Sequence, residues 1–244
     1  MQIPKIRLSI VIPVYNEAAI ITQTLQKVDA YMSAKGHRSE VIIVDDGSTD
    51  STATLVAEFA RGKPEVRLVS NDTNQGKGFS IRHGVQESRG EFVLFSDADL
   101  STPIEEADKL LAWLEKGYDV AIGTRGTGNG TVYVPQPPIR LLAGKTFSLI
   151  QRAVAGVNIG DTQCGFKAYT RNAANKIFPM QRIRGFAFDV ENLYLAQKLG
   201  FRIRPVPVDW VNNRDSRVRF LNDSLRMLAD LVAIRVNSVR RLYR

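Results

Sequence analysis

Cysteine and histidine are nearly absent from this chain, and both absences exclude classes of site. Cys164 is the only cysteine among 244 residues, so no disulfide can form within the chain, and a reducing compartment is expected. The two histidines, His37 and His83, are too few for a histidine-rich metal site. Long apolar runs are missing too: no stretch approaches the roughly 18 residues of a membrane-spanning helix. Leu8–Val14 is also too short for the apolar region of a signal peptide.

The composition is that of an ordinary globular protein. Hydrophobic residues make up 44% of the chain and charged residues 24%, which is enough apolar material for a full core. The sequence shows no internal repeat, low-complexity segment or linker. We therefore predict a single domain over residues 1–244.

Positive charge is concentrated at the C-terminal end of the chain. The net charge is +8, and residues 201–244 contribute +6 of it through ten arginines and four aspartates. Such a tail indicates an anionic partner such as lipid, nucleic acid or a phosphorylated substrate, or else a solvated basic helix. An amphipathic helix is predicted over residues 221–242, which either packs on the domain or lies on a membrane. Its apolar residues at helical spacing are Leu221, Leu225, Leu228, Val232, Val236 and Val239.

Strand-like and helix-like segments alternate through the first half of the chain. The predicted strands are Leu8–Val14, Glu40–Val44, Val66–Ser70, Glu91–Ser96 and Asp119–Gly123. The predicted helices between them are Ala18–Ala34, Thr52–Arg61, Lys77–Ser88 and Ile104–Lys116. This order predicts an α/β fold with a Rossmann-like, open and mostly parallel sheet that is covered by helices on both faces.

The pattern changes after residue 125. Gly126–Pro138 is rich in glycine, threonine and proline, which predicts a mobile loop that could cover a site. Further helices are predicted at Arg140–Ala155 and Val190–Leu199, and further strands at Cys164–Thr170 and Arg202–Trp210.

Two carboxylates spaced i, i+2 are the most informative feature of the sequence. Asp97 and Asp99 follow the apolar run 92–95, which is typical of a buried strand in a parallel sheet. In an extended segment this spacing places both side chains on one face, at the sheet edge where α/β proteins bind ligands. Hard oxygen ligands favour Mg²⁺ or Mn²⁺ shared with a substrate's phosphates. The alternative is a helix cap, because residues 101–103 are typical of a helix start.

Further acidic residues follow the first two predicted strands. Glu17, Asp45 and Asp46 fall at the same edge if the strands are parallel, and such a cluster needs a cation or ligand donors. Carboxylates at this edge also accept hydrogen bonds from nucleosides, and Gly47 predicts a tight turn that aims them. Asn74–Gly78 opens the third helix and predicts either contact with an anion or ordinary turn chemistry. Its glycine spacing fits neither the dinucleotide fingerprint nor the Walker A loop.

These segments together resemble the family 2 glycosyltransferases with the GT-A fold. Four segments in this order carry the resemblance: Ile12–Glu17, Val44–Asp50, Asn74–Gly78 and Asp97–Asp99. Three later segments resemble the dolichyl-phosphate glucosyltransferase and mannosyltransferase branch, the glucosyl members most closely: Asp161–Lys167, Phe188–Glu191 and Val208–Trp210. The match runs from about residue 8 to residue 234.

The resemblance implies a nucleotide-sugar donor and gives roles to the residues that match the family's motifs. The nucleotide would be bound by Pro13, Tyr15, Glu17, Asp46, Lys77, Asp97 and Ala98. The metal, Mg²⁺ or Mn²⁺, would be held by Asp97 and Asp99. The implied catalytic residues are Asp99, Arg125 and Asp161. An acceptor phosphate would be held by Arg125, Arg140 and Lys167.

The implied reaction is an inverting transfer of a hexose, expected to be glucose from UDP-glucose, to a polyprenyl or dolichyl phosphate. The second pKa of such a phosphate is near ~6, so the acceptor is already an anion at neutral pH and needs cations more than a strong base. The metal would neutralise the leaving diphosphate. We expect a cytoplasmic protein held peripherally on the membrane face, and no nucleic-acid partner.

Other functions remain to be weighed against this one. A glycosyltransferase of the same fold that acts on a hydroxyl group would require a general base, and Asp161 is the first candidate. A basic nucleic-acid binder is disfavoured because aromatic residues do not interleave with the arginines of the tail. An NAD-dependent oxidoreductase lacks its glycine fingerprint here.

Overall fold

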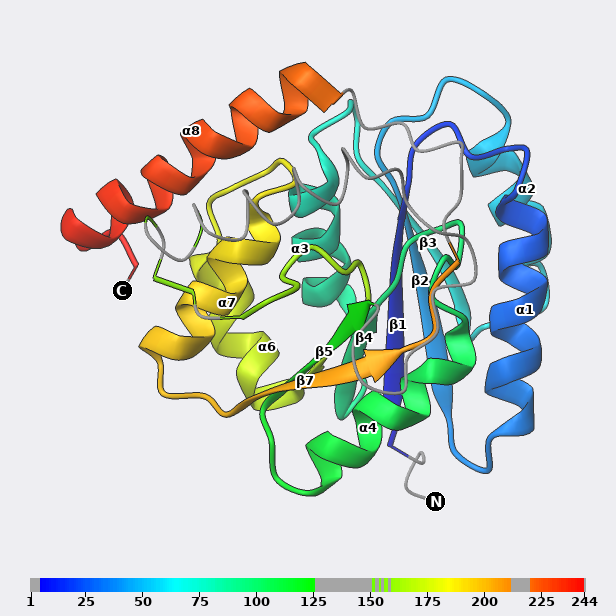
Figure 1. The fold of residues 1–244 in the computed structure, drawn as a ribbon. Coiled ribbons are helices and arrows are strands. Elements are labelled where there is room, and N and C mark those ends of the chain that lie inside the picture. Colours follow the sequence, from blue (N-terminus) through cyan, green and yellow to red (C-terminus); the bar gives the residue numbers. More distant parts are fainter. Residues whose placement is uncertain are drawn as a thin grey trace.

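The structure, a computed structural model, describes residues 5–125, 151, 154, 156–157, 159–211 and 220–243. Within these residues, seven strands form one open sheet in the order β3-β2-β1-β4-β6-β5-β7 (Figure 1). Their bounds are Leu8–Val14 (β1), Ser39–Asp45 (β2), Val66–Ser70 (β3), Phe92–Phe95 (β4), Val120–Arg125 (β5), Lys167–Thr170 (β6) and Ile203–Val208 (β7). Only β6 runs antiparallel to its neighbours, which confirms the mostly parallel sheet.

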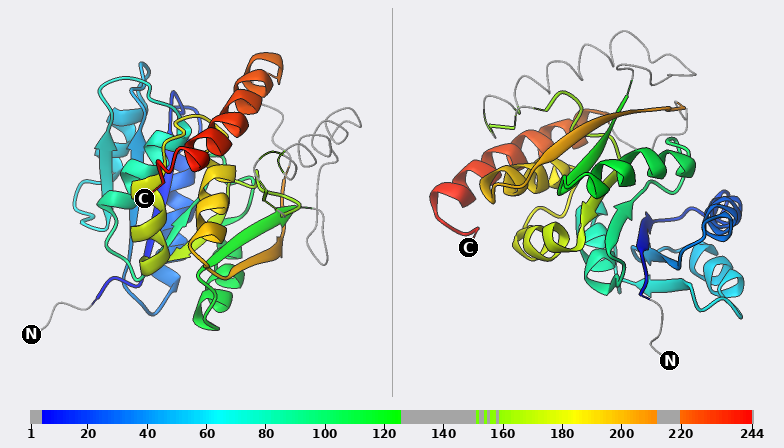
Figure 2. Two further views of the ribbon diagram at one scale, coloured as in Figure 1. Left: turned by 90° about the vertical axis from the view of Figure 1, so that its left-hand side faces the viewer. Right: turned by 90° about the horizontal axis from the view of Figure 1, so that it is seen from below.

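Helices lie on both sides of this sheet, as the sequence predicts (Figure 2). Their bounds are Ile21–Ala34 (α1), Thr52–Phe59 (α2), Lys77–Glu87 (α3), Ala107–Glu115 (α4), Arg171–Ile177 (α6), Phe188–Lys198 (α7) and Phe220–Val239 (α8). Two short 3₁₀ helices are Ile104–Glu106 (η1) and Phe178–Met180 (η2). None of the helices among the described residues combines the length and the apolar character needed to cross a membrane.

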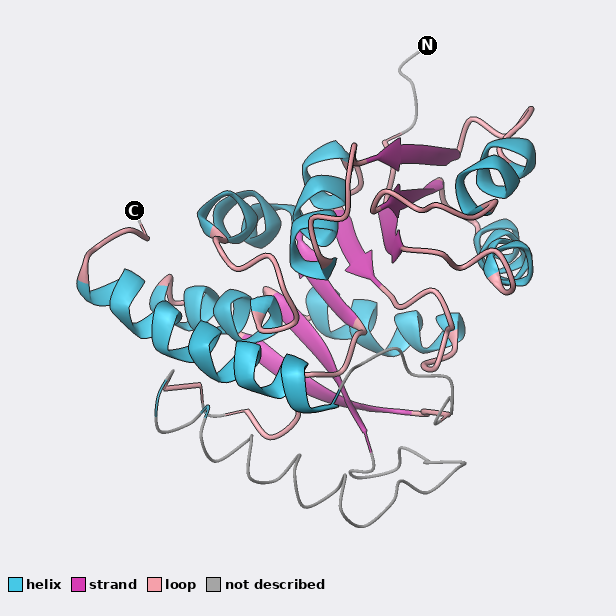
Figure 3. Cartoon of the chain, turned by 90° about the horizontal axis from the view of Figure 1, so that it is seen from above, coloured by secondary structure: helices cyan, strands magenta, loops and turns pink. Residues whose placement is uncertain are grey.

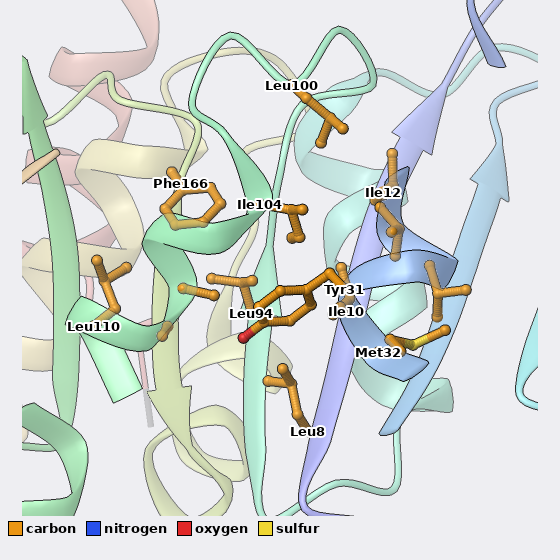
Figure 4. Close-up of a cluster of buried hydrophobic side chains, with 14 of the residues drawn as sticks. Leu8, Ile10, Ile12, Tyr31, Met32, Leu94, Leu100, Ile104, Leu110 and Phe166 are labelled. Carbon is orange, nitrogen blue, oxygen red and sulfur yellow. The ribbon is translucent and has the colours of Figure 1, made fainter. Parts of the chain in front are cut away.

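Two separate cores form because successive side chains of a strand point to opposite faces. Leu8, Ile10 and Ile12 of β1 join one core with side chains of α1 and α4 (Figure 4). Val11, which lies between them in the sequence, joins the second core with α3, α6, α7 and α8. The central strands β1 and β4 are therefore apolar at every position except Ser9, whose hydroxyl donates to Glu40 Oε1 at 2.6 Å, as expected for a sheet covered on both faces.

The start of α1 differs from the prediction for a local reason. The helix begins at Ile21 and not at Ala18, because the Glu17 carbonyl accepts from the N–H groups of Ile20 (3.0 Å) and Ile21 (2.9 Å) in a turn. The N–H of Ala18 donates instead to the carboxylate of Asp50 at 3.1 Å. This turn holds the loop after β1 against the loop after β2.

Helix α6 is not predicted from the sequence. Thr170 is its N-cap residue, and its side chain accepts a hydrogen bond from the N–H of Ala173 at 3.2 Å. The predicted loop 126–138 and most of the predicted helix 140–155 lie outside the described residues.

Candidate functional site

The carboxyl ends of β2, β1 and β4 lie side by side at one edge of the sheet. These strands are adjacent and parallel, and Asp45 at the end of β2 is in register with Val14 at the end of β1. Beyond β4, the N–H of Ser96 still donates to the carbonyl of Val11 at 3.0 Å. The loops after all three strands therefore meet at this edge, as predicted.

The loops after β1 and β2 are joined by side-chain hydrogen bonds. Asn16 has a φ of 55°, a left-handed conformation that asparagine tolerates, and its Oδ1 accepts from the N–H of Thr49 at 2.7 Å. The N–H of Asn16 donates to Ser48 Oγ, and that of Glu17 to Thr52 Oγ1, both at 2.8 Å. The predicted nucleotide-binding loop is thus held in place by the segment that follows β2.

Asp46 is buried and holds the loop that leads into α3. Its carboxylate accepts from Asn71 Nδ2 at 2.8 Å and from the backbone N–H groups of residues 75 and 76 at 2.9 and 2.8 Å. The predicted turn is present at Gly47, where φ is 73° and a Cβ atom would lie 2.8 Å from the backbone of Thr73. A contact between Asp46 and a nucleoside stays a prediction.

The remaining residues of the predicted nucleotide pocket lie at the same edge. Pro13 is partly buried within β1, and Tyr15, just beyond the strand, is 40% exposed. Ala98 is buried, and its carbonyl accepts from Thr24 Oγ1 at 2.6 Å. The structure brings these residues to one edge, while their contacts with a ligand stay predicted.

Asp97 and Asp99 lie in a turn, so the predicted extended geometry is wrong. The N–H of Leu100 donates to the carbonyl of Asp97 at 3.1 Å, and Leu100 has a φ of 45°. The carboxylate of Asp99 accepts from the N–H (2.9 Å) and the Oγ (2.7 Å) of Ser101. Helix η1 begins after Pro103 without a side-chain cap, so neither carboxylate serves as the cap that was the alternative.

Asp97 lies between a lysine and a glycine. Its Oδ1 is 2.5 Å from Lys77 Nζ, and a Cβ atom on Gly165 would overlap its carboxylate. Burial disfavours the charge on Lys77, but Asp97, Asp189 and Asp99 outweigh it and raise the pKa of Lys77 above its usual value. Lys77 therefore brings a permanent positive charge to the strand-end acids.

The glycines at the start of α3 serve packing. The carbonyl of Arg184 accepts from the N–H groups of Gly78 (2.7 Å) and Phe79 (3.2 Å). Gly76 has a φ of 97°, and a Cβ atom on it would lie 2.6 Å from the same carbonyl oxygen. On Gly78, a Cβ atom would lie 2.6 Å from Phe188 Cβ. The structure thus favours ordinary turn chemistry over contact with an anion here, because these N–H groups already donate to a carbonyl of the protein.

Arg125 and Asp161 form a bidentate ion pair. Arg125 donates from Nε to Oδ2 at 2.8 Å and from Nη2 to Oδ1 at 2.7 Å, and its N–H donates to Oδ2 at 3.0 Å. The guanidinium also lies 5.4 Å from the centroid of the Trp210 ring. Burial alone would raise the pKa of Asp161, but the hydrogen bonds and charge of Arg125 lower it below its usual value. Asp161 is therefore a stable carboxylate and a weak base.

Lys167 does not have the position expected of an acceptor-phosphate residue. It is fully buried, and its Nζ donates to the Asp189 carboxylate and to the Cys164 carbonyl, the latter at 2.6 Å. The ammonium group also lies 5.2 Å from the centroid of the Phe95 ring. The sequence prediction is corrected here, because these partners enclose the charge inside the protein. Arg140 was also expected to hold the acceptor phosphate, and it lies outside the described residues.

The pair of Lys167 and Asp189 is expected to contribute to stability. We expect Lys167→Met to lower the free energy of unfolding by about 3–5 kcal/mol, because it leaves the buried Asp189 carboxylate without its cation. Urea denaturation measures this loss. Lys63→Met is the control, since the pair of Lys63 and Asp29 is partly exposed and its loss should cost no more than about 1 kcal/mol. Equal stability of the two variants would contradict the assignment.

The two strand-end carboxylates fit a hard divalent cation that is shared with a ligand. Asp99 is exposed and the side chain of Asp97 is 39% exposed, so solvent reaches both. Across the described part of the chain, no group of three or more His, Cys, Asp or Glu side chains is placed to hold a metal by itself. Mg²⁺ is commonly held by one or two carboxylates together with substrate phosphates, which is the arrangement these residues allow.

Sequence reasoning gave no role to three residues that shape this site. Asp189 neutralises Lys167, Gly165 leaves room for Asp97, and Trp210 lies against Arg125. All three fall within the later segments that resemble the glucosyltransferase branch, so a signal was present. Their contacts depend on how β6, α7 and β7 come together, which no local pattern shows.

A protein-family model and individual relatives of this chain both point to glycosyltransferases. The model described as "Glycosyl transferase family 2" matches residues 9–178. A dolichyl-phosphate beta-glucosyltransferase of Trichomonas vaginalis is 36% identical over 238 residues, covering 93% of this chain and 70% of that protein. The dolichyl-phosphate beta-glucosyltransferase of Homo sapiens is 33% identical over 250 residues, covering 96% of this chain and 76% of that protein.

Solved structures show the same GT-A fold at lower identity. Mannosyl-3-phosphoglycerate synthase from Rubrobacter xylanophilus has a TM-score of 0.71 and 20% identity, covering 97% of this chain and 74% of that one. Glucosyl-3-phosphoglycerate synthase from Mycobacterium tuberculosis, in complex with Mn²⁺, UDP-glucose and phosphoglyceric acid, has a TM-score of 0.68 and 20% identity, covering 95% and 79%. The motifs, the sheet and these relatives agree, and the chain belongs to glycosyl transferase family 2, where it is similar to the dolichyl-phosphate beta-glucosyltransferases.

Proposed function

We propose that this protein transfers glucose, with inversion, from UDP-glucose to a polyprenyl or dolichyl phosphate. The ion pair of Arg125 and Asp161 is the observation that favours a phosphate over a hydroxyl group as the acceptor. A hydroxyl acceptor needs a general base, and Asp161 is a weak one because Arg125 lowers its pKa. A phosphate acceptor needs no base, because it is already ionised near neutral pH. The names of the relatives support the same acceptor and sugar.

The donor's diphosphate would lie against the strand-end carboxylates. Asp97 and Asp99 would hold Mg²⁺ or Mn²⁺, and the bound ion would offset the charge of the leaving nucleoside diphosphate. Lys77 holds Asp97 in place and adds a positive charge beside the diphosphate. Tyr15 and Glu17, on the loop after β1, would contact the nucleoside. Glucosyl-3-phosphoglycerate synthase, which has the same fold, was solved with UDP and Mn²⁺ or Mg²⁺, and this supports a donor that is bound together with a divalent cation.

The acceptor phosphate would be held by Arg125. Its guanidinium carries five N–H donors, and the two that bond Asp161 fix the orientation of its plane. The pKa of Arg125 is raised because the attraction of Asp161 outweighs the effect of burial, so the cation persists at every working pH. The arginine would thus attract the second anionic substrate, while the aspartate positions the arginine.

A lipid-linked acceptor also places the protein at a membrane. We propose peripheral contact with the membrane on its cytoplasmic face, which agrees with the reducing compartment expected from a single free cysteine. Interfacial binding needs no spanning helix, since an amphipathic helix with basic residues can lie at the surface.

A matrix of donors and acceptors tests this proposal. Purified enzyme with Mg²⁺ or Mn²⁺ is offered UDP-glucose, UDP-galactose or GDP-mannose, each with polyprenyl phosphate, with the uncharged polyprenol or with 3-phosphoglycerate. We expect a glucosyl phosphate lipid from UDP-glucose and polyprenyl phosphate, and at least about tenfold less product from the other pairs. Mass spectrometry of the products measures this. Transfer to a hydroxyl group, with none to the lipid phosphate, would instead establish the alternative hydroxyl-directed enzyme.

A further inference from the structure

Helix α8 is apolar on two opposite sides, and the described residues cover only one of them. Leu231 and Ile234 are fully buried in the core that α8 shares with α3, α6 and α7. Val232, Val236 and Val239 are 55, 39 and 75% exposed. At about 100° per residue these valines fall within about 60° of one another, on the side away from Leu231 and Ile234. Of the predicted apolar stripe, Leu228 packs against this core, whereas Val232, Val236 and Val239 face solvent.

Positive charge lies along this outer surface. The exposed Arg235 of α8 and Arg240, the first residue beyond it, fall on either side of the three valines by helical geometry, since the N–H of Arg240 still donates to the carbonyl of Val236 at 2.9 Å. Arg241 comes next in the chain. Leu242 is 40% exposed and continues the apolar surface. Between residues 231 and 243 there is no aspartate or glutamate. An apolar strip edged by arginine is complementary to a bilayer surface with anionic headgroups.

The inner side of α8 is fastened to α7 at the C-terminal end. Tyr243 is buried, and its hydroxyl donates to Glu191 Oε1 at 2.6 Å. Lys198 Nζ donates to the carbonyl of Tyr243 at 3.2 Å, and Arg182 Nη2 donates to the carbonyl of Leu242 at 3.0 Å. Figures 1 and 3 show α8 running alongside α7 on the outside of the molecule.

This attachment connects the outer surface to the candidate site. Glu191 Oε2 accepts from the N–H groups of Arg182 (3.0 Å) and Ile183 (2.8 Å). The backbone carbonyl of the next residue, Arg184, accepts from N–H groups in the first turn of α3. That turn carries Lys77, which contacts Asp97. A surface that binds α8 would therefore orient the whole strand-end site.

We propose that the outer face of α8, formed by Val232, Val236 and Val239 with Arg235 and Arg240, docks on an anionic lipid surface. The valines enter the boundary between headgroups and acyl chains, and the two arginines contact the headgroups. The proposal depends on the proposed function only in that a lipid-linked acceptor gives docking a purpose. The surface itself follows from exposure, charge and helix geometry.

Vesicle sedimentation with purified protein tests the docking. Wild-type protein is expected to bind vesicles of phosphatidylcholine and phosphatidylglycerol at low salt, and binding should weaken as salt screens the arginines. The triple variant Val232→Glu, Val236→Glu, Val239→Glu should lose this binding. Glutamate favours helix more than valine does, so the variant should fold, and circular dichroism checks this. Failure of wild-type protein to bind, or unchanged binding of the triple variant, would overturn the proposal.

Arginine variants separate this surface from general basicity. Each arginine near an anionic leaflet strengthens binding about fivefold, which is about 1 kcal/mol, so Arg235→Gln with Arg240→Gln should weaken binding about 25-fold. Arg61→Gln with Arg89→Gln removes the same charge at exposed positions outside α8 and should change binding little. Equal loss in both double variants would overturn the assignment to α8.

Two further readouts distinguish other outcomes. Light scattering reports whether the valine face instead joins two copies of the chain. A dimeric wild-type protein with a monomeric triple variant would show that it does, and this result would overturn lipid docking. Calorimetry of UDP-glucose binding in solution should give the same affinity for wild-type and triple variant. Vesicle binding needs neither donor nor acceptor, so its failure would leave the proposed reaction intact, and a failed transfer assay would leave the docking result intact.

Discussion

Replacement of Asp99 by alanine is expected to lower turnover by at least about 10²–10³-fold, the loss typical of removing one major electrostatic stabiliser. Asp99 is exposed in the turn after β4, and its carboxylate is held in place by Ser101. In our account it binds the metal that offsets the charge of the leaving diphosphate, so its loss acts on the transition state more than on folding. Initial rates with UDP-glucose and polyprenyl phosphate, in Mg²⁺ and in Mn²⁺, measure the effect.

A matched control is available on the surface of α2. Glu58→Ala removes an exposed carboxylate on a helix away from the strand-end acids and should leave turnover unchanged. Thermal unfolding should be close to wild type for both variants, since neither side chain is buried. An Asp99→Ala enzyme with near wild-type turnover would remove Asp99 from the site.

Replacement of Asp161 by asparagine is expected to lower turnover by about 10²-fold without changing the shape of the pH–rate profile. The carboxylate orients Arg125 through two side-chain hydrogen bonds, and small errors in the position of a binding group can cost this much. Because Arg125 lowers the pKa of Asp161 below its usual value, the carboxylate is fully ionised from pH 5 to pH 8. Protonation of Asp161 cannot then produce an acidic limb in that range.

The full pH–rate profile of the variant decides between the two acceptors. With a phosphate acceptor, any acidic limb follows the acceptor's own second pKa, near ~6, and is the same in both enzymes. With a hydroxyl acceptor, Asp161 would be the general base, and Asp161→Asn would abolish turnover at every pH. Arg125→Lys is the reciprocal variant: it keeps the charge but loses the bidentate geometry, so it should resemble Asp161→Asn. A fully active Asp161→Ala enzyme would exclude this pair from the reaction.

The order of elements in the first half of the chain was predictable, because apolar strands and amphipathic helices have distinct periods. β1 and β3 have the predicted bounds, Leu8–Val14 and Val66–Ser70. The direction of β6 was not predictable, since the side-chain period of a strand is the same in parallel and antiparallel pairs. Only its pairing with β4 and β5 shows that it runs antiparallel.

The acidic edge was predictable for the same reason, but the partners of its charges were not. Asp97 was expected in an extended segment, but it lies in a turn in which the N–H of Leu100 donates to the Asp97 carbonyl. Lysine is a residue type that commonly binds phosphate, yet Lys167 on β6 is buried and its ammonium group contacts Asp189 inside the protein. Residue type predicts the chemistry of a group, whereas its partners depend on contacts between segments that are distant in the sequence.

Titration calorimetry of UDP-glucose binding tests the central claim most directly, namely that Asp97 and Asp99 bind the donor through a shared divalent cation. Wild-type protein is titrated in Mn²⁺ and again in EDTA, and Asp99→Ala is titrated in Mn²⁺. We predict measurable binding of wild-type protein in Mn²⁺, and at least about tenfold weaker binding both in EDTA and in the variant. Equal affinity in all three titrations would contradict the account.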